Sequence, residues 1–135
     1  MKNKHICVLD DDKSIRWVLD KALKKENYNV SCFENVEAFL EDFQKTSPDI
    51  IISDVRMPGI NGIDMLEKIK REYPSIPIII MTAFSDLETT VSSLQKGAYE
   101  YITKPFDIDS VISIVNSACN NISKSSLNSP LDYTN

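Results

Sequence analysis

The sequence predicts a doubly wound α/β fold, in which a five-stranded parallel sheet carries helices on both faces. Continuous apolar runs at residues 6–9, 50–52 and 78–81 are typical of strands that are covered on both faces. Between these runs lie segments whose apolar residues follow the helical period. A regular alternation of strand and helix favours a parallel sheet with crossover helices. In such sheets, ligands bind beyond the carboxyl ends of the strands, where the strand order reverses.

The elements can be placed one by one along the chain. The predicted strands span residues 6–9, 29–33, 50–52, 78–81 and 99–103, and the predicted helices span residues 15–23, 36–43, 62–73, 86–96 and 108–118. Pro74 ends the third helix, and Gly97 ends the fourth. By the same periodicity, four aromatic residues are assigned to core packing: Trp17, Phe33, Phe39 and Phe43. His5 has no evident partner, and we assign it to the surface.

Length and composition indicate one globular domain. The chain has 135 residues, of which 42% are hydrophobic and 26% charged. No apolar stretch approaches the ~20 residues needed to span a bilayer, and the N-terminus lacks the apolar core of a secretory signal. We therefore expect a cytoplasmic protein that does not contact membranes.

The cysteines and the net charge indicate the state of the thiols and the kind of partner that this domain can bind. Cys7, Cys32 and Cys119 are odd in number and lack C-x-x-C spacing, which favours buried free thiols. A net charge of −5 argues against nucleic acid as a direct partner of this domain, because phosphate binding needs a basic patch. After residue 122 the composition turns polar, with serine, asparagine and Pro130. We assign residues 1–122 to the domain and residues 123–135 to a linker toward a missing output domain.

Carboxylates gather where two predicted strands end. Asp10, Asp11 and Asp12 follow the first strand, and Asp54 follows the third. Mg2+ prefers oxygen ligands and takes only one or two carboxylates from a protein. We assign Asp11 and Asp54 as direct ligands, Asp10 as a ligand through water, and the backbone carbonyl of Arg56 as a further ligand. Asp12 is assigned instead to the N-cap of the next helix.

Asp54 is the candidate phosphoryl acceptor. A carboxylate nucleophile needs the transferring charge neutralised by a cation on one side and an ammonium on the other. Lys104 ends the last strand and can provide the ammonium, while the Thr82 hydroxyl can bond a phosphoryl oxygen. The three residues suit reversible phosphorylation of an aspartate.

A switch follows from the position of Thr82. This residue leads directly into the fourth helix, so its movement toward a phosphoryl group can bias that helix between two packings. The helix is thinly apolar, with a stripe of Leu87, Val91 and Leu94. We expect phosphorylation to expose or reorient this stripe for docking. Tyr101 is either a packed aromatic, which we prefer, or a rotamer that reports the state of the site.

Four short motifs occur in a recognisable order and spacing. They are Leu9-Asp10-Asp11-Asp12, Ser53-Asp54-Val55-Arg56-Met57-Pro58-Gly59, Met81-Thr82-Ala83 and Lys104-Pro105-Phe106. Over roughly residues 4–122 the chain resembles the receiver domain of bacterial two-component response regulators. Residues 14–19, 53–62 and 104–109 are most similar to the nitrogen-regulatory NtrC type, whereas Phe84 and Leu94 depart from it.

The resemblance implies a regulatory phosphoacceptor rather than a turnover enzyme. A sensor histidine kinase would donate the phosphoryl group to Asp54, Mg2+ would be the cofactor, and a cis bond would precede Pro105. The resemblance also implies a longer parent protein, a sigma-54-dependent transcription activator with an ATPase and a DNA-binding domain. On activation the receiver would dock to another receiver or to that ATPase.

An enzymatic alternative comes from the first acidic cluster. Asp10-Asp11-Asp12-Lys13-Ser14 also fits the start of haloacid-dehalogenase phosphatases, with Asp10 as nucleophile. Such enzymes need a further acidic pair at a strand end. Here, Asp107 and Asp109 fall in the predicted first turn of a helix, which disfavours this alternative.

Two non-enzymatic alternatives share the predicted fold. A flavodoxin-like FMN binder would need a phosphate loop after the first strand, where this chain has acids that repel phosphate. A stand-alone phosphorelay receiver would keep the same phosphoacceptor chemistry without an output domain, and the sequence leaves this alternative open.

Overall fold

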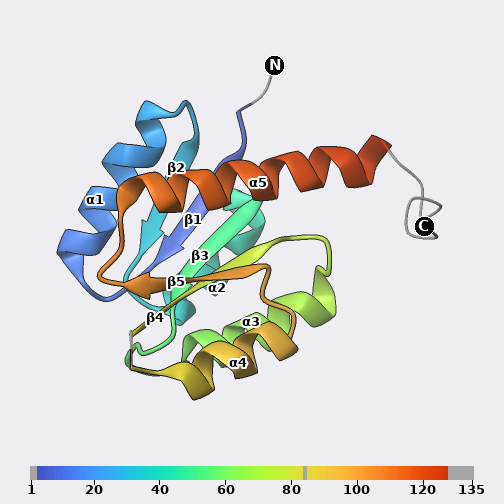
Figure 1. The fold of residues 1–135 in the computed structure, drawn as a ribbon. Coiled ribbons are helices and arrows are strands. Elements are labelled where there is room, and N and C mark those ends of the chain that lie inside the picture. The colour runs from blue at the N-terminus through green and yellow to red at the C-terminus, as the bar shows by residue number, and fades with distance from the viewer. Residues whose placement is uncertain (1–2, 84, 128–135) are drawn as a thin grey trace.

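The computed structural model describes residues 3–83 and 85–127, with side chains as far as residue 120. A parallel sheet of five strands in the order β2-β1-β3-β4-β5 lies between helices on both faces, which confirms the predicted fold (Figure 1). The strands are β1 (His5–Leu9), β2 (Asn29–Phe33), β3 (Ile50–Asp54), β4 (Ile78–Ala83) and β5 (Glu100–Lys104). The helices are α1 (Lys13–Lys25), α2 (Val36–Thr46), α3 (Gly62–Glu72), α4 (Leu87–Gln95) and α5 (Ile108–Leu127).

The sheet order places the ends of β1 and β3 side by side. The chain adds β2 on one side of β1 and then crosses over to add β3 on the other side. Leu9 pairs with Ser53, and Asp54 pairs with Met81 on β4. Residues that follow β1 therefore lie beside the end of β3, at the point where the strand order reverses.

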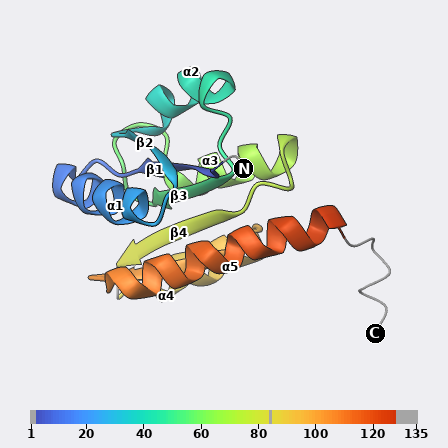
Figure 2. The same cartoon turned by 90° about the horizontal axis from the view of Figure 1, so that it is seen from above.

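Each face of the sheet has its own hydrophobic core, because successive strand residues point to opposite faces. Cys7 and Leu9 of β1 pack with α2 and α3, whereas Ile6 and Val8 pack with α1 and α5. Figure 2 shows α2 and α5 on opposite sides of the strands. The helix crossovers thus bury β1, β3 and β4 except at single end residues, namely His5, Asp54 and Ala83.

Polar side chains begin the first four helices. Asp12 is the N-cap of α1, as predicted, and its Oδ1 accepts hydrogen bonds from the backbone amide of Ser14 at 2.8 Å and of Ile15 at 3.4 Å. Asn35, Asn61 and Asp86 cap α2, α3 and α4 in the same way. These caps satisfy backbone amides that have no partner inside the helix.

Trp17 was wrongly assigned to the core, since 62% of this residue is exposed. Leu19, two positions along α1, is fully buried. Two residues at that spacing lie on opposite sides of a helix, so only one of them can face the sheet. The three phenylalanines do pack as predicted: the rings of Phe33, Phe39 and Phe43 meet edge to face with centroids 5.5 and 5.6 Å apart.

Tyr101 and His5 also differ from the predictions. Tyr101 is 36% exposed rather than packed in the core, because β5 is an edge strand and its neighbour Ile102 faces the buried side. His5 begins β1 and is half-buried. Its Nε2 lies 2.8 Å from the hydroxyl oxygen of Ser31 on β2, so the ring has a partner that the sequence did not reveal.

The last helix passes the predicted start of the linker. α5 continues to Leu127, and its last turns project beyond the sheet in Figure 1. The polar composition after residue 122 therefore does not end the helix. Residues 128–135 of the predicted linker, and Phe84, lie outside the described residues. No helix within the described ranges, 3–83 and 85–127, is long and apolar enough to cross a membrane.

The three cysteines are free thiols, as predicted. Only Cys7 is fully buried, whereas Cys32 and Cys119 are half-buried.

We expect Leu19→Ala to lower the free energy of unfolding by about 2–5 kcal/mol, because it opens a cavity in a closed core. Trp17→Ala should change it by less than about 0.5 kcal/mol, because the indole is mostly in water. Urea unfolding of both variants measures the difference. Comparable losses would contradict the exposed position of Trp17.

Candidate functional site

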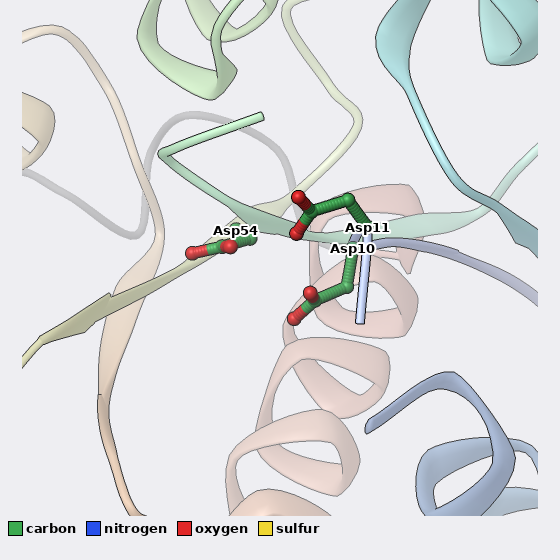
Figure 3. A group of neighbouring side chains, drawn as sticks. All are labelled: Asp10, Asp11 and Asp54. Carbon is green, nitrogen blue, oxygen red and sulfur yellow. The ribbon is translucent and has the colours of Figure 1, made fainter. Parts of the chain in front are cut away.

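Three carboxylates meet where β1 and β3 end. Asp10 and Asp11 follow β1 and Asp54 ends β3, and the three side chains each offer an oxygen within 4.8 Å of the others. Figure 3 shows the three side chains together at this end of the strands. Asp10 is fully buried, Asp54 is partly buried and Asp11 is exposed. The structure therefore brings together the carboxylates that the sequence predicted as a group.

Lys104 neutralises two of these acids. Its Nζ lies 2.7 Å from Asp10 Oδ2 and 3.3 Å from Asp54 Oδ2. The lysine ends β5, which is two strands away from β3 in the sheet. Its long side chain therefore has to extend past the end of β4 to contact Asp54. The backbone amide of Val55 donates to Asp54 Oδ1 at 2.9 Å, which fixes the orientation of this carboxylate.

The crowding of charge changes the proton affinity of both partners. Burial, and then the negative charge of Asp10, raises the pKa of Asp54 above its ordinary value, while Lys104 opposes that rise. Burial by itself lowers the pKa of Lys104, but the hydrogen bond and charge of Asp10, followed by those of Asp54, raise it overall. The lysine thus stays protonated at neutral pH, as an ammonium role requires.

Arg16 holds the main chain of the acidic turn, a contact that the sequence analysis missed. Its Nη1 donates to the carbonyl oxygen of Asp10 at 2.8 Å, and the amide of Asp12 donates to Asp10 Oδ1 at 2.9 Å. Lys104 and the Asp12 amide thus bind the two carboxylate oxygens of Asp10, and Arg16 binds its backbone carbonyl. The contact joins residues six positions apart across a helix N-terminus, and no local pattern marks it.

The turn after β3 is packed tightly against the site. A Cβ atom on Gly62 would lie 2.3 Å from the carbonyl oxygen of Asp54, so only glycine fits there. Arg56, whose carbonyl is a predicted ligand, extends its side chain to Asp86, with Nη2 and Oδ2 3.1 Å apart. Asp86 is the N-cap of α4. One residue of this turn thus links the acidic cluster to α4.

Thr82 is 2% exposed and forms a hydrogen bond with Thr90 of α4, with 3.1 Å between the two hydroxyl oxygens. Thr90 and Ser93 are the buried residues of this helix. The sequence analysis did not single out Thr90, although a polar stripe of Asp86, Thr90 and Ser93 at helical spacing marks that face.

The apolar stripe of α4 is already exposed, contrary to the expectation that phosphorylation exposes it. Leu87 is 71% exposed, Val91 45% and Leu94 41%. The small hydroxyl residues Thr90 and Ser93 occupy the inner face of the helix, so the larger apolar residues lie on its outer side. Reorientation of the stripe is the part of that hypothesis that remains.

The peptide bond between Lys104 and Pro105 is cis, as the family resemblance implied. Asp109 lies in the first turn of α5 and Asp107 just precedes it, which leaves the phosphatase alternative without its second acidic pair at a strand end.

Comparison with known proteins decides the family. Residues 6–116 match the family model described as the response regulator receiver domain. The chain belongs to this family. A receiver is a non-enzymatic phosphoacceptor that is phosphorylated by histidine kinases, and the Asp10, Asp11 and Asp54 cluster is typical of a receiver Mg2+ site.

Individual relatives agree with the family. The DNA-binding transcriptional regulator NtrC of Escherichia coli is 46% identical over 118 residues, which cover 87% of this chain and 25% of that protein. Full-length FixJ from B. japonicum matches with a TM-score of 0.84 and 32% identity, over 93% of this chain and 62% of the other. A CheY-like receiver domain protein from Methanospirillum hungatei matches with a TM-score of 0.85 and 26% identity, over 91% of this chain and 98% of the other. This receiver spans about a quarter of the length of its NtrC relatives.

Asp54→Asn should stabilise the receiver when no divalent metal is present. Folding raises the pKa of Asp54 above its ordinary value of 3.8, so the charged carboxylate is less stable in the folded protein than in the unfolded chain. The free energy of unfolding therefore falls as pH rises from 3.8 through the raised pKa, and the loss is complete above both pKa values. We therefore expect the variant to unfold at higher urea concentration than the wild type at neutral pH, with the gap closing toward about pH 4. The exposed, isosteric change Glu41→Gln is the control. An Asp54→Asn variant that is less stable at neutral pH would contradict the raised pKa.

Proposed function

We propose that this receiver accepts a phosphoryl group on Asp54 from the phosphohistidine of a sensor kinase. The observation that carries the proposal is the position of Lys104, whose ammonium lies between Asp10 and Asp54. A carboxylate oxygen of Asp54 forms the new P–O bond as the P–N bond of the donor breaks, and the histidine nitrogen keeps the bonding electrons. Lys104 can then follow the added negative charge onto a phosphoryl oxygen.

The residues present fit a magnesium ion. Asp11 and Asp54 would hold it directly, together with the backbone carbonyl of Arg56. Asp10 already accepts bonds from Lys104 and from the amide of Asp12, which suits a contact with the ion through water. When bound, Mg2+ supplies positive charge next to the transferring phosphoryl group. The protein's own contribution is to orient Asp54 through the Val55 amide and to keep Lys104 charged.

We further propose that the receiver controls a transcription activator of the NtrC type. The support is the 46% identity with a protein named as a DNA-binding transcriptional regulator. In this proposal, phosphorylation reorients α4 so that Leu87, Val91 and Leu94 dock to another receiver or to an output ATPase that acts on sigma-54 polymerase. Tyr101, on the neighbouring edge strand, would report the change. A stand-alone relay receiver is the second candidate, and it shares the Asp54 chemistry.

Phosphorylation is tested by intact mass after incubation with acetyl phosphate. Wild-type protein should gain one phosphoryl group with Mg2+ and none in excess EDTA, because the acidic cluster repels phosphate until a cation is bound. Asp54→Asn should gain none in either condition. A modification that survives in Asp54→Asn but is lost in Asp10→Asn would place the nucleophile on Asp10 and overturn the proposal.

Movement of α4 is tested by amide hydrogen exchange. We expect phosphorylation to change the exchange rates of residues 87–95 several-fold, because the residues that this helix buries, Thr90 and Ser93, are small and polar. Residues 13–25 of α1 should exchange at the same rate in both states. Equal protection of α4 before and after phosphorylation would indicate a static helix.

A further inference from the structure

A short chain of hydrogen bonds runs from Thr82 into α4. The hydroxyl oxygen of Thr82 lies 3.1 Å from that of Thr90, and the Thr90 hydroxyl donates to the backbone carbonyl of Asp86 at 3.1 Å. Thr82 is 2% exposed and Thr90 7%. Because both residues are buried, solvent has little access to form a hydrogen bond in place of either hydroxyl.

The direction of these bonds follows from counting protons. A threonine hydroxyl has one proton to donate, and a carbonyl oxygen can only accept. Either hydroxyl could donate to the other by distance alone, but a Thr90 proton that goes to the Asp86 carbonyl leaves only the Thr82 proton for the contact between them. We therefore assign Thr82 as the donor and the Thr90 hydroxyl oxygen as its acceptor.

A phosphoryl oxygen also only accepts, so it competes with Thr90 for the same proton. We propose that Thr90 is a positioning residue, which keeps the Thr82 hydroxyl on α4 until a phosphoryl group on Asp54 takes its proton. The inference rests on the proposed function, and it adds the step that couples the site to α4. Once Thr82 donates to the phosphoryl group instead, Thr90 still donates to the Asp86 carbonyl. The Thr90 oxygen no longer accepts a hydrogen bond from Thr82.

The packing of α4 makes this bond important for the position of the helix. Its other buried hydroxyl, that of Ser93, donates within the helix to the carbonyl of Thr90 at 2.9 Å and contributes no side-chain bond to β4. Two ion pairs also hold α4, but each has a solvent-exposed member and is therefore weakened by water: Arg56, which pairs with Asp86, is 78% exposed, and Lys96 and Glu67 are 38% and 43% exposed. Among the described residues, the Thr82–Thr90 pair is the side-chain hydrogen bond that joins α4 to β4.

The coupling is measured with beryllium trifluoride, a phosphoryl analogue, titrated by calorimetry in the presence of Mg2+. In the wild type, binding must first break the bond from Thr82 to Thr90. Thr90→Val removes the acceptor, so we expect the analogue to bind about three- to tenfold more tightly, the worth of one hydrogen bond. Thr90→Ser keeps an acceptor at the same place and should restore wild-type affinity. Ser93→Ala, which removes the other buried hydroxyl of α4, should leave the affinity unchanged.

A double-mutant cycle separates positioning from a general effect of packing. In a Thr82→Val background there is no proton to compete for, so Thr90→Val should have no further effect on affinity. The inference is overturned if Thr90→Val binds no more tightly than the wild type, or if its gain persists in the Thr82→Val background. Should Thr90→Val fail to fold by circular dichroism, Thr90→Ala carries the same cycle. A wild type that binds no analogue would instead refute the proposed function.

Discussion

The repulsion among three carboxylates, and its partial neutralisation by Lys104, is the constraint on which the rest of the site depends. Asp10 is fully buried, and a buried carboxylate is tolerated only when it is paired. The lysine that pairs with it comes from β5, the last strand of the sheet. Formation of the site therefore requires that β1, β3, β4 and β5 already lie in the correct order.

The same charge balance explains why the site can respond to a ligand. Asp54 shares Lys104 with Asp10 and has a raised pKa, so its charge is only partly compensated. A cation improves this balance and a phosphoryl group changes it again. Lys104 contacts Asp54 directly, and two contacts join the neighbourhood of the site to α4: Arg56 with Asp86, and Thr82 with Thr90.

The sequence alone predicted the fold and the acidic cluster, because both follow from short-range patterns. Apolar runs mark buried strands, and residues after parallel strands gather at one edge of the sheet. The contact of Arg16 with the Asp10 carbonyl and the exposure of Trp17 depend on which side of α1 faces the sheet. The extension of α5 beyond residue 122 was missed because serine, lysine and asparagine weaken an apolar pattern without stopping a helix, and proline comes only at Pro130.

The inner face of α4 has a thermodynamic consequence for the switch. A helix that moves by uncovering leucine or valine side chains changes the heat capacity of the protein, since water must solvate the apolar surface. Here Thr90 and Ser93 lie inside, and Leu87, Val91 and Leu94 are already 71%, 45% and 41% exposed. A shift of α4 exchanges hydrogen bonds and wets little new apolar surface. The enthalpy difference between its positions is therefore expected to stay nearly constant with temperature.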